Sequence, residues 1–137
     1  MRLFLLIAIA VAVMSFGMVP AQVRAATPTP TASAPPEDPA VTQVARAELD
    51  AWESGKVDRS KYSADAQKHI TNDLVANIAK QMGPLGAPTS FKYVGHAQQY
   101  GMDLTQYEAV FPQITLTESI SIDPTGKIVF IYFTPKQ

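Results

Sequence analysis

Residues 114–128 read ITLTESISIDPTGKI. Apolar and small polar residues alternate strictly over 114–122, which predicts a β-strand with one apolar and one polar face. A carboxylate, Glu118, interrupts the apolar face between Leu116 and Ile120. It either lies inside a pocket, where burial would raise its pKa and suit it to acid–base chemistry, or at the rim of the sheet. We expect the rim.

The segment after this strand indicates a tight turn and another strand. Asp-Pro-Thr-Gly at 123–126 has proline and glycine where a turn needs them. The following KIVFIYF, residues 127–133, is apolar on both faces, as in strands that are covered on both sides. We expect this strand to lie centrally in a curled sheet; the alternative is that a partner covers its outer face, with Ile131 and Phe133 at the interface.

Two earlier segments also have β character. They read SFKYVGHAQQ at 90–99 and LTQYEAVF at 104–111. Because all the connections are short, the four strands should form an antiparallel meander.

The residues before the sheet predict helices. Asp38-Pro39 is a strong N-terminal signal, and an apolar stripe ends at Trp52, before Gly55. A second helix should run from Ser63 to Met82, with a break near residues 71–73. The sequence therefore predicts an α+β domain over residues 39–136, with two N-terminal helices packed on a curled four-stranded meander.

The N-terminal residues are predicted to be an export signal and a tether. Arg2, an apolar run over 3–14 and small residues up to Ala25 are typical of a signal peptide over 1–25; an uncleaved membrane anchor is the alternative. Residues 26–38, rich in proline, threonine and alanine, should form a disordered linker. We therefore expect a bacterial protein that is periplasmic or secreted.

Composition excludes several functions. Removal of residues 1–25, which contain Arg2 and Arg24, reduces the 11 basic residues to 9 against 12 acidic ones, a net charge of −3. This charge does not favour binding to nucleic acid. The chain has no cysteine, so packing without disulfides must hold the domain together, and no lipidated N-terminal cysteine is available.

Three segments occur in the order found in a known kind of domain. They are WESGKVDRSKYS at 52–63, LGAPTSFKYVG at 85–95 and DPTGKIVFIYFTP at 123–135. The chain resembles small bacterial exported domains of the cystatin-like, nuclear-transport-factor-like cone fold, found alone or appended to secreted serine hydrolases of the β-lactamase or peptidase type. The resemblance implies a curved sheet around helices with a cavity at its wide end, and no specific activity.

No motif for a nucleophile, a phosphate loop or a metal is present in the sequence. His69 and His96 lie on different predicted elements, so we expect no metal and no cofactor. Glu118 and His96 are the candidates for catalysis, if they share a cavity; His96 should lie on the strand face opposite to Phe91 and Tyr93.

An aromatic set could line a ligand pocket or could simply form the core. Its members are Phe91, Tyr93, Tyr107, Phe130 and Tyr132. The favoured hypothesis is a non-catalytic exported module that binds a protein, a second copy or a small apolar ligand through the sheet or its cavity. The alternatives are a small acid–base enzyme that uses Glu118 with His96 or a tyrosine, and a domain that only helps to assemble an envelope complex.

Overall fold

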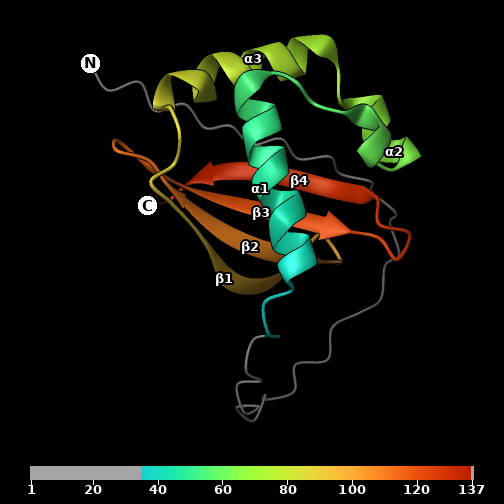
Figure 1. The fold of residues 1–137 in the computed structure, drawn as a ribbon. Helices are drawn as coiled ribbons and strands as arrows, with labels where there is room; N and C mark the ends of the chain where they lie inside the picture. Colours follow the sequence, from blue (N-terminus) through green and yellow to red (C-terminus); the bar gives the residue numbers. More distant parts are fainter. Residues whose placement is uncertain (1–34, 137) are drawn as a thin grey trace, which may run out of the picture.

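A computed structural model describes residues 35–136 of the chain. These residues form three α-helices and a four-stranded antiparallel sheet, an α+β arrangement in which the first helix crosses one face of the sheet (Figure 1). The predicted signal peptide and residues 26–34 of the predicted linker lie outside the described residues. Within residues 35–136, no helix has the length and apolar character to cross a membrane.

Helix α1, Pro39–Ser54, has the predicted ends. The Asp38 side chain accepts a hydrogen bond from the main-chain N–H of Ala40 at 2.9 Å, and Pro39 occupies the first turn. Gly55 ends the helix with a φ of 71°. The backbone conformation favours glycine, and a Cβ there would also lie only 3.2 Å from the Cβ of Ala79 on the neighbouring helix α3, a tight contact.

The predicted second helix is broken near residues 71–73, as expected. Helix α2, Ala64–His69, begins after Ser63, and helix α3, Asn72–Met82, begins after Thr71, whose hydroxyl accepts from the N–H of Leu74. Short 3-10 turns, η1 at Arg59–Lys61 and η2 at Gly83–Leu85, flank this pair. The break lets α3 pack against α1 while α2 lies beside the last strand.

The four strands form the predicted meander, in the order β1-β2-β3-β4. Their bounds are β1 Ser90–Gln99, β2 Met102–Val110, β3 Thr115–Ile122 and β4 Ile128–Pro135. The turn before β4 is held by Asp123, whose carboxylate accepts from the N–H groups of Thr125 and Lys127.

A β-bulge corrects the predicted face of His96. The pairing of β1 with β2 shifts between Tyr93 and Gly95, so Val94 has no opposite residue. This extra residue moves His96 to the face that carries Tyr93, and the two rings meet edge to face with centroids 5.9 Å apart. Glycine supplies the φ of 138° that the backbone adopts at position 95.

The prediction of a central position for the last strand is wrong, because β4 lies at an edge of the sheet. Its outer face is instead partly covered by the tip of the β1–β2 hairpin. The Tyr132 hydroxyl donates to Oε1 of Gln99 at 2.6 Å, and the rings of Tyr100 and Phe130 have centroids 5.8 Å apart. The hairpin therefore curls over the outer face of a strand that is not its neighbour in the sheet.

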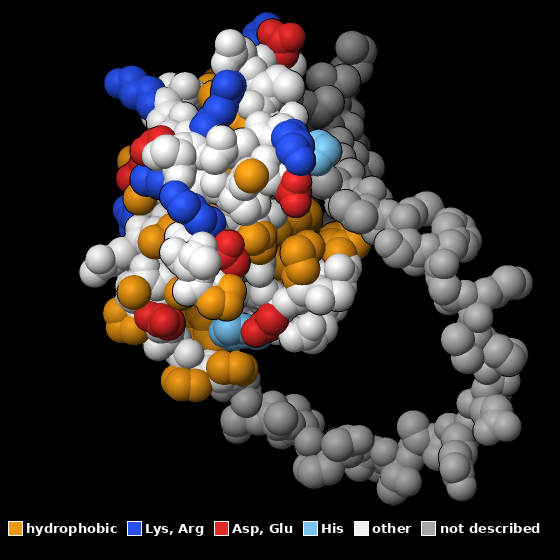
Figure 2. Space-filling view, turned by 90° about the vertical axis from the view of Figure 1, so that its right-hand side faces the viewer, with side chains coloured by type: hydrophobic (Ala, Val, Ile, Leu, Met, Phe, Trp, Pro, Cys, Tyr) orange, Lys and Arg blue, Asp and Glu red, His pale blue; other side chains and the backbone are white. Residues whose placement is uncertain are grey.

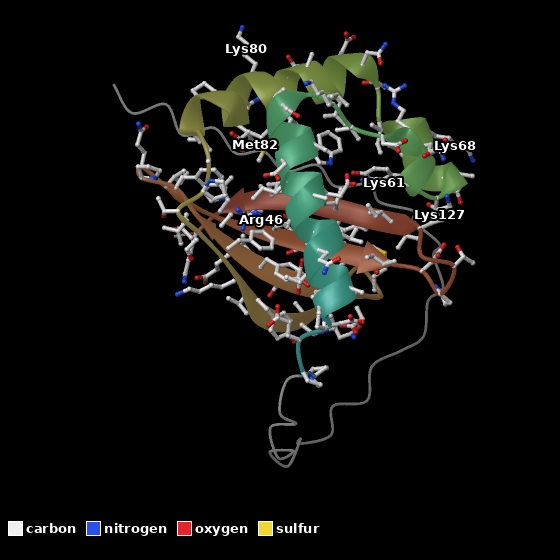
Figure 3. The ribbon with its side chains drawn as sticks, in the orientation of Figure 1. Arg46, Lys61, Lys68, Lys80, Met82 and Lys127 are labelled. Atoms are coloured by element: carbon white, nitrogen blue, oxygen red, sulfur yellow. The ribbon has the colours of Figure 1, made fainter. Side chains whose placement is uncertain are left out.

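The main core lies between the helices and the inner face of the sheet. Its centre includes fully buried Leu49 of α1, Tyr107 of β2 and Ile120 of β3. Met82 at the end of α3 belongs to the same core (Figure 3).

Candidate functional site

A groove with a volume of about 950 Å³ lies between α2, α3 and β4. Its helical wall is mostly apolar and includes Ile70, Leu74, Ile78 and Met82. Its other wall is β4, which brings residues of both its faces to the groove because the groove extends around the edge of the sheet. Hydrophobic side chains gather on the side of the molecule that carries α2, with charged side chains around them (Figure 2).

The polar residues of the groove come mostly from α2. Lys68 forms an exposed ion pair with Asp65 at 2.6 Å, one helical turn away. Lys61, Lys68 and Lys127 lie on the same side of the molecule (Figure 3). Each already has a partner, since Lys61 contacts Glu48 and Lys127 donates to the carbonyl of Ser60. These cations therefore do not form a free anion site, and the groove suits an apolar molecule.

The predicted aromatic set is divided between two places. Phe130 and Tyr132 line the groove from the outer side of β4, together with Tyr100 and Met102. Ile131 and Phe133, the predicted interface residues, line it from the inner side.

The other three aromatic residues are outside the groove lining. Phe91 stacks on Tyr107 with centroids 5.0 Å apart, and Tyr93 meets Tyr107 edge to face at 5.9 Å. Arg46 of α1 lies 5.5 Å from the centre of the Phe91 ring, and the Tyr107 hydroxyl bonds with that of Thr42 at 3.1 Å. These contacts join α1 to the sheet, so these three aromatic residues have a packing role.

The expected rim position of Glu118 is wrong. Its exposed fraction is 0%, and it faces the core from β3, opposite Tyr107 and beside Phe133. Neither carboxyl oxygen has a hydrogen-bond partner within the described residues. Burial raises the pKa of Glu118 well above its ordinary value, and the negative charges of Glu48 and Asp50 raise it further. Glu118 is not among the residues that line the groove.

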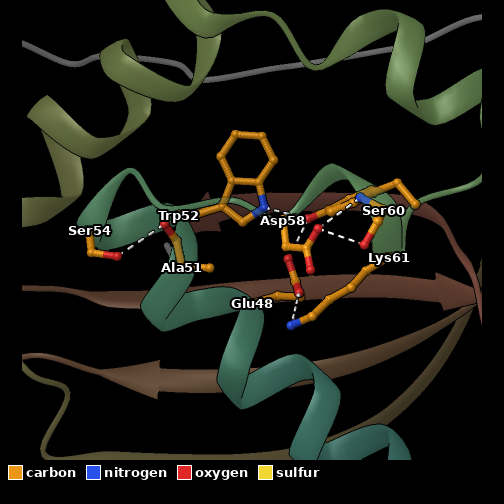
Figure 4. A network of polar contacts seen from close by, with 8 residues as sticks. Glu48, Ala51, Trp52, Ser54, Asp58, Ser60 and Lys61 are labelled. Atoms are coloured by element: carbon orange, nitrogen blue, oxygen red, sulfur yellow. Dashed lines mark hydrogen bonds and ion pairs between the residues drawn. The ribbon is translucent and has the colours of Figure 1, made fainter.

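Sequence reasoning missed a second buried carboxyl group, Glu48 of α1, whose exposed fraction is also 0%. Its Oε2 accepts from the Tyr62 hydroxyl at 2.6 Å, and its Oε1 accepts from the Lys61 ammonium at 3.3 Å. The Trp52 indole N–H donates to the same tyrosine oxygen at 2.8 Å. Figure 4 shows this network at the junction of α1 and η1. Glu48 follows Val44 by four residues and precedes Trp52 by four, so helical spacing could have revealed its burial.

The network also changes the pKa of the Tyr62 hydroxyl. Burial and the hydrogen bond to Glu48 raise the pKa of its hydroxyl far above the ordinary value. The tyrosine stays neutral at physiological pH and acts as a hydrogen-bond donor inside the core.

His96 is not brought to Glu118. Its Nδ1 lies 3.1 and 3.2 Å from the two carboxyl oxygens of Asp103, at the hairpin end of β1 and β2. The two candidate catalytic residues therefore occupy separate environments. Within residues 35–136, no three side chains of the metal-binding types gather in one place.

Comparison of the chain with protein families, with curated proteins and with solved structures found no match.

Proposed function

We propose that this protein is an exported, non-catalytic module that binds a small apolar molecule in the groove between α2, α3 and β4. One observation carries the proposal: a space of about 950 Å³ is walled mostly by apolar side chains. A groove of this size falls within the range of small-molecule sites, which are typically roughly 300–1,000 Å³.

The composition of the walls supports an apolar ligand. Leu74, Ile131 and Val129 are each half-buried and line the groove, so a ligand would remove their remaining apolar surface from water. The polar side chains at the α2 end would contact a polar head group or solvent.

The proposed family and location are in keeping with this function. Two features are in keeping with the cone fold: helices that pack against the sheet, and the antiparallel meander. The N-terminal sequence supports export into the bacterial periplasm or medium. The acid–base alternative gains no supporting observation, since Glu118 does not line the groove and His96 pairs with Asp103.

The test is titration of the protein with N-phenyl-1-naphthylamine, an uncharged probe whose fluorescence rises in apolar surroundings. Wild type should bind it saturably at one site. Leu74→Gln, which places an amide in the helical wall, should weaken binding about 10-fold or more, since an unpaired buried amide costs about 1–3 kcal/mol.

Val44→Gln is the matched control. Val44 is also half-buried on a helix and packs against the core, but it does not line the groove. It should therefore leave probe affinity unchanged even if it lowers stability. Absence of saturable binding to wild type, or equal losses in the two variants, would contradict the proposed site.

A further inference from the structure

The two edges of the sheet are protected to different degrees. Edge strand β1 carries Lys92 and the bulge at Val94, two devices that discourage pairing with another strand. Edge strand β4, IVFIYFTP, has no charged residue along its whole length. An uncharged apolar edge of this kind is open to a further strand.

Hydrogen bonding identifies the main-chain groups on the free edge of β4. The N–H of Lys136 donates to the carbonyl of Thr115 at 2.8 Å, so the main chain of Lys136 faces β3. Because this direction alternates along an antiparallel strand, Tyr132 also faces β3, whereas Ile131 and Phe133 direct their N–H and C=O groups to the free edge. Pro135 falls on that edge too, where a missing N–H costs no bond within the sheet.

The chain itself covers one end of this edge. The N–H of Ser63 donates to the carbonyl of Ile128 at 2.9 Å, next to a parallel bridge between Tyr62 and Ile128. Residues 129–135 remain uncovered by this contact. Tyr132 is the midpoint of that segment, and Ile131 and Phe133 flank it symmetrically.

This symmetry makes the edge complementary to itself. In an antiparallel pair of two β4 strands centred on Tyr132, Ile131 of each copy lies opposite Phe133 of the other copy. Both pairs can exchange their N–H and C=O groups, and no like charges come together.

We propose that two copies of this protein associate through β4, forming one continuous sheet. The pairing depends on main-chain groups and neutrality of the strand, so it does not require the apolar ligand proposed above. The alternative occupant of this edge is an extended peptide from another protein, and the self-complementary register favours a second copy.

The first experiment measures molar mass by light scattering and sedimentation between about 1 and 100 µM, where mass action shifts a dimer of ordinary affinity. The full chain is expressed with its own N-terminal segment. It is purified without added ligand from the cell fraction or medium in which it accumulates. Wild type should show the mass of two copies. If the protein is a monomer at every concentration in this range, the proposal is overturned. The same holds if the monomer binds an added extended peptide but does not pair with a second copy.

Charge at Tyr132 locates the interface. This side chain would face its own copy across the symmetry axis, so Tyr132→Lys should weaken association at least ~100-fold through like-charge opposition, as should Tyr132→Glu. An equimolar mixture of the two variants should restore a mixed dimer, which an effect on folding alone would not do. A dimer that persists in Tyr132→Lys overturns the assignment to β4.

The control is Val94→Lys, which adds the same charge at an exposed position of β1, the protected edge. It should leave the dimer intact. Loss of the dimer in this variant would indicate that β1 is the interface and would overturn the proposal. Neither the molar mass of wild type nor that of Val94→Lys depends on a change at position 132. These two measurements therefore test whether a dimer forms, and whether β1 is its interface, even if Tyr132→Lys fails to fold.

Discussion

Glu48 on α1 and Glu118 on β3 are two carboxyl groups buried equally deeply, and their surroundings are opposite. Glu48 accepts hydrogen bonds from Tyr62 and Lys61, whereas neither oxygen of Glu118 has a partner within the described residues. Both interrupt an apolar pattern, one at helical spacing and the other at strand spacing.

The difference shows that burial alone does not define the role of a carboxyl group. Glu48 stabilises the junction of α1 and η1, because it satisfies a buried hydroxyl that also accepts from Trp52. Burial and the nearby negative charges both oppose ionisation of Glu118. Its pKa is therefore raised well above the ordinary value of a glutamate, and the neutral form is favoured. The first group contributes to stability and the second costs stability.

The largest expected effect is at Tyr62, the centre of the satisfied network. Tyr62→Phe removes one hydroxyl and leaves both the Trp52 N–H and an oxygen of Glu48 without that partner. The free energy of unfolding should fall by about 2–4 kcal/mol, measured by urea denaturation. Tyr93→Phe is the matched control, because the Tyr93 hydroxyl donates at an exposed site, to the carbonyl of Pro35. Equal losses in the two variants would contradict the special role of the network.

A smaller effect of opposite sign is expected at Glu118. Glu118→Leu replaces a buried carboxyl without hydrogen bonds by an apolar side chain of similar size, so the free energy of unfolding should rise by about 1–2 kcal/mol at pH 7. Glu48→Leu makes the same chemical change in the satisfied network and should instead lower it by about 1–3 kcal/mol. Chemical denaturation of both variants checks the pair. A loss of stability in Glu118→Leu would indicate that the carboxyl has an unrecognised partner.

The smallest effect, counted per pH unit, is a pH dependence of stability that Glu118 should impose. Its pKa is raised in the folded state, so its contribution to stability is fully present below the pKa of an unfolded glutamate, near 4.3, and is lost as the pH rises through the folded value. Relative to Glu118→Leu, wild type should lose at most about 1.4 kcal/mol per pH unit over that window. Denaturation of both proteins from about pH 4 to pH 8 measures the difference, and parallel profiles would contradict an elevated pKa.

Much of the architecture could be predicted because local signals agreed with one another. Asp38, Gly55, Ser63 and Thr71 act at helix ends as their types predict, and the alternation over 114–122 matches β3. Each signal depends on contacts between residues near in sequence, or on a period that local geometry imposes.

The errors all arose from interactions between distant segments. His96 changed face because of one extra residue in the pairing of β1 with β2, and a strand with two apolar faces proved to be at an edge. Its outer side chains meet a hairpin tip that is distant in sequence, through Tyr132 and Gln99. Periodicity reports which residues share a face but not what covers that face.

The sequence by itself determined the class of the domain, the order of its helices and strands, and the anomaly of a glutamate on an apolar face. Only the tertiary structure decided that Glu118 is buried without a partner while Glu48 is buried with two, and that the groove lies along β4 rather than around Glu118. The physical reason is that desolvation and hydrogen-bond satisfaction depend on which remote side chains surround a group, whereas helix caps, turns and periodicity are properties of the local chain.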